Sequence, residues 1–437
     1  MAVRQRLKTG AAALITSAAM HDLRRKVHEM RRRLMAADHV VTFYHRVDDP
    51  YSHLLAQVLP ALLERFDITL AHRLVPAPVA AMAPEPELLA GHGLRDCAEL
   101  ARYYALEFEG AWRLPSAELS ARATAILAAA ETPAFPTLAP EVGRALWAGA
   151  GAELEALAAA HGAADGAAVA RALGEGRAEL EKRGHYQGAM LHYGGEWYWG
   201  IDRLSWLEER LAGLGLEAEA GAASAVASRP RSELPGDELE AGDDGEVRLD
   251  FYLSFRSPYT FLAMARVLDL VERYPVRLNA KPVLPMLMRG LPVPRPKQLY
   301  ILGDAAREAR RIGLPFGNFF DPLGPGVERC MAIFPYAERE GRVVEYLRAT
   351  FEGIWTRALD AASDAGLRAM VEQAGLDWGE AKARLDDESW REMAQRNQRD
   401  LAAEGLWGVP SFALGPYAAW GQDRIWIIEE KLKAHLG

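Results

Sequence analysis

The sequence has very little cysteine. Cys97 and Cys330 are the only two among 437 residues, and there is no C-x-x-C motif. This scarcity argues against a disulfide scaffold and against the paired thiols of a thiol–disulfide oxidoreductase. One cysteine in each half indicates two separate buried thiols in a reducing compartment. We therefore expect a cytoplasmic protein whose cysteines are not its reactive groups.

The sequence also has no long apolar run and no excess of positive charge. No run reaches the roughly 18 apolar residues that crossing a bilayer requires, so no membrane span is expected. Lys and Arg number 51 against 60 Asp and Glu, a formal net charge of −9, which argues against nucleic acid as the main partner. The length predicts two domains.

The first 37 residues depart from this acidic balance, with nine Lys and Arg against Asp22 and Glu29. Gly10–Met20 could be the apolar core of a signal peptide. It is, however, short, rich in alanine and followed by more basic residues without a clear cleavage site. We interpret residues 1–37 as a basic N-terminal helical leader.

The remaining sequence contains two similar halves. Phe43–Ala56 reads FYHRVDDPYSHLLA and Phe251–Ala263 reads FYLSFRSPYTFLA, with their prolines 208 positions apart. WGIDRL at Trp199–Leu204 recurs as WGQDRI at Trp420–Ile425, 221 positions later. Two matches in the same order, with a matching helical segment between them, indicate a tandem duplication.

A linker separates the halves. Ala220–Glu246 is rich in Ala, Ser, Gly, Pro and acidic residues, a composition that cannot bury an apolar face. We place the linker at 216–246, between domains at 38–215 and 247–437.

The hydrophobic pattern predicts the same order of elements in both halves. The first half opens with a strand (Val40–Tyr44) and one helix (Pro50–Glu64). The second half is predicted as strand Val247–Leu253, helix Pro258–Arg273, strand Val276–Ala280, helices between 297 and 403, strand Ser411–Leu414 and helix Asp423–Leu436. This order predicts an α/β chain of two thioredoxin-like domains, each with an all-α insertion.

Three short motifs in the second half carry candidate chemistry. Ser257 precedes Pro258 where a helix begins, a place that stabilises an anion, although for this motif alone a plain helix cap is the favoured interpretation. Val409–Pro410 enters a strand, and a cis bond would leave the Val409 backbone open to pair with an extended ligand; a trans edge-strand start is the alternative. Gln422 and Asp423 could cap the last helix or bind the ammonium and carboxylate of an amino acid.

Taken together, SPY after the first strand, GVPSF and WGQDR resemble the 2-hydroxychromene-2-carboxylate isomerases and kappa-class glutathione transferases, which have a DsbA-like thioredoxin fold. Segments 292–317 and 397–412 extend the resemblance over nearly all of the second half. It implies glutathione as cofactor, with Ser257 at the sulfur and Val409, before Pro410, at the cysteinyl backbone. Gln422 and Asp423 would hold the γ-glutamyl end.

The resemblance also matches Lys297 to a lysine that lines the family's site. The chain departs from the family's pattern at one point, which bears on the choice of substrate. An asparagine of the family is absent where this chain has Arg289, Gly290 and Leu291.

The first half lacks these groups. By spacing, Asp49 stands at the place of Ser257, Leu89 at that of Lys297 and Ala189 at that of Pro410. A carboxylate would repel a thiolate, and Asp49 is also a good helix cap. We expect a degenerate domain without glutathione and a Gly188–Ala189 bond that is not cis.

The favoured function is therefore a glutathione-dependent isomerase or transferase acting on a small aromatic or unsaturated acid. A non-catalytic thioredoxin-like binding or scaffold protein is the alternative, and a thiol–disulfide oxidoreductase is a third choice. Because the family forms homodimers, the two halves are expected to pair as an intramolecular pseudo-dimer.

Overall fold

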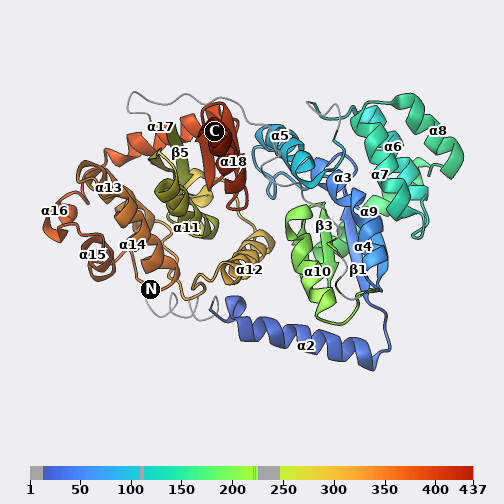
Figure 1. The fold of residues 1–437 in the computed structure, drawn as a ribbon, viewed down its shortest axis with the longest axis horizontal. Coiled ribbons are helices and arrows are strands. Elements are labelled where there is room, and N and C mark those ends of the chain that lie inside the picture. Colours follow the sequence, from blue (N-terminus) through green and yellow to red (C-terminus); the bar gives the residue numbers. More distant parts are fainter. Residues whose placement is uncertain (1–12, 109–112, 220, 222, 225–246, 437) are drawn as a thin grey trace. The chain divides into compact units, whose positions relative to one another are not determined.

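The computed structural model describes residues 13–108, 113–219, 221, 223–224 and 247–436 (Figure 1). These residues form two compact units. One lies within Leu23–Leu234, and the other lies within Pro235–Gly437 and takes in the described residues up to Asp22. Most of the predicted linker 216–246 and residues 1–12 of the leader lie outside the described residues. In the described part of the chain, no helix is long and apolar enough to cross a membrane.

The N-terminal unit contains one sheet and a set of helices inserted between its second and third strands. Its strands are β1 (Val40–His45), β2 (Thr69–Leu74), β3 (Met190–Tyr193) and β4 (Glu196–Trp199). Its helices are α2 (Ala18–Leu34, which begins before the unit), α3 (Pro50–Gln57), α4 (Leu59–Arg65), α5 (Pro86–Tyr104), α6 (Ala117–Ala129), α7 (Phe135–Trp147), α8 (Gly151–His161), α9 (Gly166–Lys182), the short η1 (Ile201–Arg203) and α10 (Leu204–Ala212).

The C-terminal unit repeats this plan. Its strands are β5 (Val247–Leu253), β6 (Val276–Pro282), β7 (Ser411–Leu414) and β8 (Tyr417–Trp420). Its helices are α11 (Pro258–Arg273), the short η3 (Met286–Arg289), α12 (Arg295–Arg311), α13 (Pro325–Arg339), α14 (Val343–Trp355), α15 (Asp364–Gln373), α16 (Trp378–Ala383), α17 (Trp390–Ala403) and α18 (Ile425–Leu436).

The two sheets have the same topology. Their strand orders are β2-β1-β3-β4 and β6-β5-β7-β8, with a parallel first pair and antiparallel second and third pairs. The register is also the same: Phe43 pairs with Leu191, and their counterparts 208 and 221 positions later, Phe251 and Phe412, pair likewise. The predicted α/β class is therefore confirmed, and the three strands predicted in the second half are observed as β5, β6 and β7, whereas β8 was not predicted as a separate strand.

Apolar side chains cover both faces of the C-terminal sheet. Phe251 and Phe412 point to the face where α11, α13 and α14 form the main core, and their rings stack at 5.4 Å. Tyr252 and Ala413 point to the opposite face, where they pack with Leu401 of α17. This alternation follows from the two-residue period of a strand, and it buries the sheet on both sides.

Two predicted helix boundaries were wrong. The single helix Pro50–Glu64 is interrupted at Val58, because Pro60 has no N–H to donate and its ring crowds the preceding turn. The last helix begins at Ile425 instead of Asp423, since Trp420 belongs to β8 and a turn follows it.

Candidate functional site

Ser257 lies where the sequence placed it, at the N-terminal end of α11. Its Oγ accepts a hydrogen bond from the Thr260 N–H at 3.1 Å, and Pro258 is the first helical residue. Proline fits there because the first N–H of a helix needs no intrahelical acceptor. The positive end of a 16-residue helix therefore meets a half-buried hydroxyl.

The Val409–Pro410 segment lies directly against this hydroxyl. Among the described residues, Val409–Pro410 is the one cis peptide bond, as predicted. The Gly188–Ala189 bond of the N-terminal unit is not cis, which was also predicted. The Ser257 Oγ donates a long hydrogen bond of 3.5 Å to the Val409 carbonyl. Tertiary folding thus brings together two groups that are 152 positions apart.

A wall of aromatic and basic side chains continues from this point. Trp407 is buried and meets Trp420 edge to face at 5.1 Å. Lys297 lies in the first turn of α12, and its ammonium is 5.6 Å from the centre of the Trp407 ring. Burial lowers the pKa of Lys297 to about 8, because the charged form loses hydration.

Arg289 also belongs to this wall. Its guanidinium donates to the Trp407 carbonyl at 2.9 Å, so it braces the loop that leads to Val409. The sequence marked this arginine only as a departure from the family's asparagine. Trp407 was missed, although it directly precedes the Gly408–Pro410 motif and an aromatic residue there was a usable signal.

Gln422 and Asp423 follow β8 and are joined to the same region. The Gly421 N–H donates to the Pro410 carbonyl at 2.9 Å. The Gln422 side chain, however, is only 1% exposed; it accepts from Arg266 at 3.0 Å, and its amide donates to Glu308 at 3.3 Å. Gln422 is therefore an internal link of the domain, whereas the Asp423 carboxylate is partly exposed.

The equivalent place in the N-terminal unit is filled by internal hydrogen bonds. Asp49 caps α3 by accepting from the Ser52 N–H at 3.1 Å and the Ser52 hydroxyl at 2.8 Å. Ser52 Oγ in turn accepts from the Ala189 N–H at 2.8 Å. Burial raises the pKa of Asp49, because its charged form loses hydration.

The two cysteines lie in the interior of the protein. Cys97 and Cys330 are free thiols with no exposed surface, as predicted. Burial raises the pKa of Cys330 to about 12, so its thiolate is not populated near neutral pH. No cluster of His, Cys, Asp or Glu suited to a metal ion occurs within the described residues.

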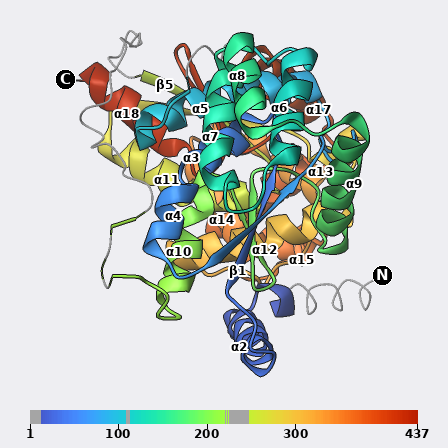
Figure 2. The ribbon, with the colours of Figure 1, turned by 90° about the vertical axis from the view of Figure 1, so that its right-hand side faces the viewer.

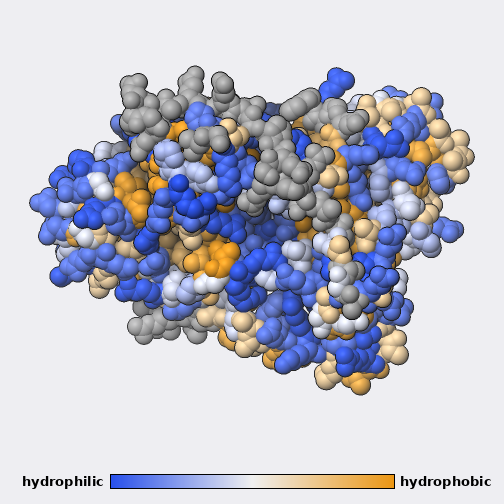
Figure 3. Space-filling view, viewed as in Figure 1, coloured by the Kyte–Doolittle hydropathy of each residue, from blue (hydrophilic) through white to orange (hydrophobic). Residues whose placement is uncertain are grey.

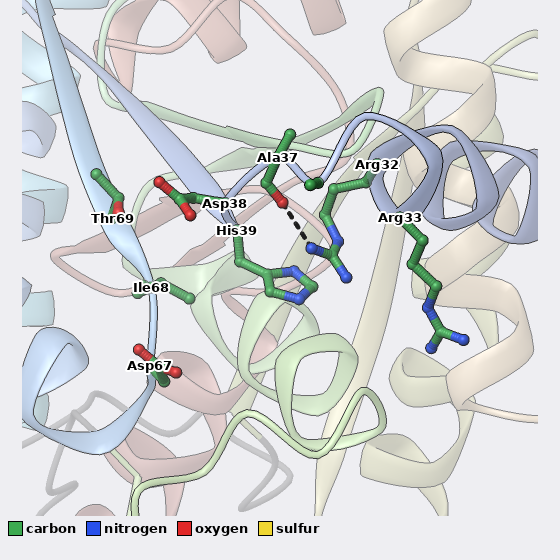
Figure 4. A pocket seen from close by; sticks show the side chains of 9 residues that line it. Arg32, Arg33, Ala37, Asp38, His39, Asp67, Ile68 and Thr69 are labelled. Carbon is green, nitrogen blue, oxygen red and sulfur yellow. Dashed lines mark hydrogen bonds between the residues drawn. The ribbon is translucent and has the colours of Figure 1, made fainter.

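A separate cavity of about 400 Å³ opens at the start of β1 and β2 in the N-terminal unit (Figure 4). Arg32, one of its lining residues, donates to the Ala37 carbonyl at 2.6 Å and pairs with Glu29 at 2.8 Å. His39 Nδ1 lies 2.5 Å from the Tyr193 hydroxyl. These polar groups hold α2 and the following loop in place, and none of the predicted site residues lines this cavity.

Comparison with known proteins matches the second half of the chain. A 2-hydroxychromene-2-carboxylate isomerase of Pseudomonas putida is 26% identical over 193 residues, covering 42% of this chain and 93% of the relative. The enzyme of the same name from Sphingobium xenophagum is 25% identical, with coverage of 42% and 97%. A solved structure of 2-hydroxychromene-2-carboxylate isomerase has 22% identity and a TM-score of 0.38, and the match covers 43% of this chain and 94% of that one.

The family comparison agrees with the topology. Residues 248–433 match the family described as DSBA-like thioredoxin domain. This range holds the whole β6-β5-β7-β8 sheet except the first residue of β5, together with Ser257, Val409 and Pro410. The second half of this chain therefore has a DsbA-like thioredoxin fold.

Proposed function

We propose that the C-terminal domain is a glutathione-dependent enzyme of the 2-hydroxychromene-2-carboxylate isomerase type. Its substrate would be a small unsaturated aromatic acid, and conjugation would result where glutathione stays attached. The observation that carries the proposal is the position of the Ser257 hydroxyl, at the N-terminus of α11 and 3.5 Å from the Val409 carbonyl.

The donor set fits a cysteine-containing tripeptide. Glutathione would supply a nucleophilic thiol. The Ser257 hydroxyl can turn from its long bond with Val409 to donate to a thiolate, while its oxygen still accepts from Thr260. The α11 N-terminus favours negative charge at Ser257, and the Lys297 ammonium adds positive charge beside Trp407, two residues before Val409. The half-buried Val409 backbone suits an extended peptide.

Gln422 and Asp423 have different roles in this proposal. Asp423 keeps a partly exposed carboxylate that can accept from an ammonium group, whereas Gln422 positions the turn through Arg266 and Glu308. Arg289, in the segment where the family's asparagine is absent, places a cation beside the Trp407 carbonyl, which suits an acidic substrate. The buried cysteines weigh against the thiol–disulfide alternative.

We also propose that the chain arose by tandem duplication and that the first domain is a scaffold without glutathione. The hydrogen bond from Tyr51 to Asp96, at 2.8 Å, has a counterpart from Tyr259 to Asp304, at 2.9 Å, with both residues shifted by 208. Shared polar pairs and register support common descent, while Asp49 replaces the serine. Two buried, reduced thiols support the cytoplasm as the compartment.

The test is a matched pair of cap substitutions. Retention on immobilised glutathione is measured first, followed by turnover of 2-hydroxychromene-2-carboxylate. Ser257→Ala should lower glutathione-dependent turnover more than about tenfold, because a hydrogen bond to a charged group contributes roughly 1.5–3 kcal/mol. Asp49→Ala removes the equivalent cap and should leave turnover nearly unchanged. Melting temperatures of both variants separate loss of function from loss of fold.

Loss of activity in Asp49→Ala but not in Ser257→Ala would place the chemistry in the N-terminal domain and refute the assignment to the C-terminal one. No retention and no turnover by the unmodified protein would favour the binding or scaffold alternative.

A further inference from the structure

Helix α2 (Ala18–Leu34) has a one-sided distribution of apolar residues. Leu23, Val27, Met30 and Leu34 follow one another at intervals of four, three and four, which places them on one face of a helix. From Leu23 onward the helix belongs to the N-terminal unit. In both views α2 projects from the end of that unit at which β1 begins (Figures 1 and 2).

An amphipathic helix normally buries its apolar face, but in α2 three of the four apolar residues of this face are exposed. Leu23 is 50% exposed, Met30 54% and Leu34 79%, and no residue of the helix is buried. Its contacts with the rest of the unit come from the polar side. Arg25 donates to both carboxylate oxygens of Glu196, at 2.7 and 2.8 Å. The packing therefore holds α2 with its apolar face outward.

The apolar face continues into a groove. A hollow of about 610 Å³ lies between α2 and α10. Met30 and Leu34 lie on one wall and Gly213 and Leu214 on the other, and six charged residues complete the lining. The space-filling view shows hydrophobic residues beside hydrophilic ones along its lower edge, over α2 (Figure 3). Exposed apolar residues that gather on one helix face in this way indicate an interaction site in a folded protein.

The charges beside the apolar face identify the kind of partner. Arg24, Lys26 and Arg31 are exposed on α2 and flank its apolar residues on the helical wheel. Basic side chains in these positions keep their ends in water while their stems cover apolar surface. A second copy of the chain would bring the same positive charge to the contact, whereas a bilayer of anionic lipids offers both negative charge and an apolar layer.

We propose that α2 is a docking helix for the surface of an anionic membrane. It lies in the plane of the headgroups, with Leu23, Met30 and Leu34 at the acyl boundary and Arg24, Lys26 and Arg31 among the lipid phosphates. Its ion pair with Glu196 fixes the helix to the N-terminal unit, so binding would bring the whole chain to the membrane surface.

Co-sedimentation of the full chain with vesicles tests this proposal. Vesicles of phosphatidylcholine alone are compared with vesicles of equal parts phosphatidylcholine and phosphatidylglycerol, at low and high salt. Binding is expected only with the anionic lipid and should weaken with salt. The double variant Leu23→Ser, Leu34→Ser should bind at least about tenfold more weakly. The triple variant Arg24→Gln, Lys26→Gln, Arg31→Gln should lose about a hundredfold.

A matched control is Leu114→Ser, which removes another exposed leucine (46% exposed) outside α2 and should bind like the unmodified protein. Equal binding by the double variant and the unmodified protein would overturn the proposal, as would equal binding to neutral and anionic vesicles. Light scattering provides a further outcome. If the unmodified protein is a dimer that binds no vesicles, and the double variant is a monomer, the apolar face contacts a second copy of the chain and the lipid partner is refuted.

Discussion

The charge of Lys297 changes within a pH range in which most lysines stay protonated. Burial beside Trp407 lowers the pKa of its ammonium from 10.5 to about 8. Because the shift is downward, the neutral amine predominates above about pH 8 in the folded protein, whereas an exposed lysine keeps its charge to about pH 10. Any ligand anion held by this ammonium should therefore bind less tightly as the pH rises through that value.

The size of the effect follows from the titration. With a pKa of about 8, Lys297 is charged in about nine of ten molecules at about pH 7 and in about one of ten at about pH 9. If the ligand binds the charged form, its affinity falls about tenfold over this range. An unshifted lysine would give almost no change.

The assay is calorimetric titration with S-methylglutathione, whose blocked sulfur cannot ionise. The unmodified protein is compared with Lys297→Arg at each pH, because a guanidinium keeps its charge throughout. Ionisation of the ligand affects both proteins alike, so the ratio of their affinities isolates Lys297. We expect this ratio to fall about tenfold between about pH 7 and about pH 9.

A constant ratio across this range would refute the reasoning. It would mean either that Lys297 is not close to the bound peptide or that its ammonium stays charged. A direct measurement of the lysine pKa by NMR separates these two cases.

Two further predictions concern stability. Burial lowers the pKa of His45 to about 3, so below about pH 6.5 the unfolded chain binds a proton that the folded one does not. This linkage should remove about 2 kcal/mol of unfolding free energy between about pH 7 and about pH 5. Urea titrations should show a smaller loss in His45→Leu, and an unchanged pH dependence would contradict the assignment. In Gly408→Ala, the new Cβ would meet Trp420 Cζ2 at 2.0 Å, and overpacking should cost about 1–3 kcal/mol in thermal unfolding. Gly303→Ala is the control, since this exposed mid-helix glycine has open space and should gain up to about 1 kcal/mol.

Much of the fold could be predicted because it depends on local patterns. The alternation in Val247–Leu253 and the helical period after Pro258 predicted β5 and α11 almost residue for residue. Errors occurred where a local signal competed with another. Pro60 broke a helix that the apolar period favoured, and the last helix was predicted to begin at Asp423 although a turn follows β8 and the helix begins at Ile425.

The candidate site was predicted in part. The helix start at Ser257 and the cis Val409–Pro410 bond were predicted by motif, and the structure joins the Ser257 hydroxyl to the Val409 carbonyl. Gln422 was expected to face a ligand, but its amide and carbonyl are used inside the domain. A sequence shows that a side chain is polar, yet it does not show whether a neighbour such as Glu308 already satisfies it.

By itself, the sequence determined the strand and helix order, the duplicated motifs and the residue types at the start of α11, because these depend on neighbours along the chain. Tertiary structure alone decided the distances between the site residues and the burial of their side chains. It joined Ser257 to Val409 across 152 positions, buried Lys297 enough to lower its pKa, and turned the apolar face of α2 outward. Burial and electrostatic environment come from groups distant in sequence, so they exist only after the chain has folded.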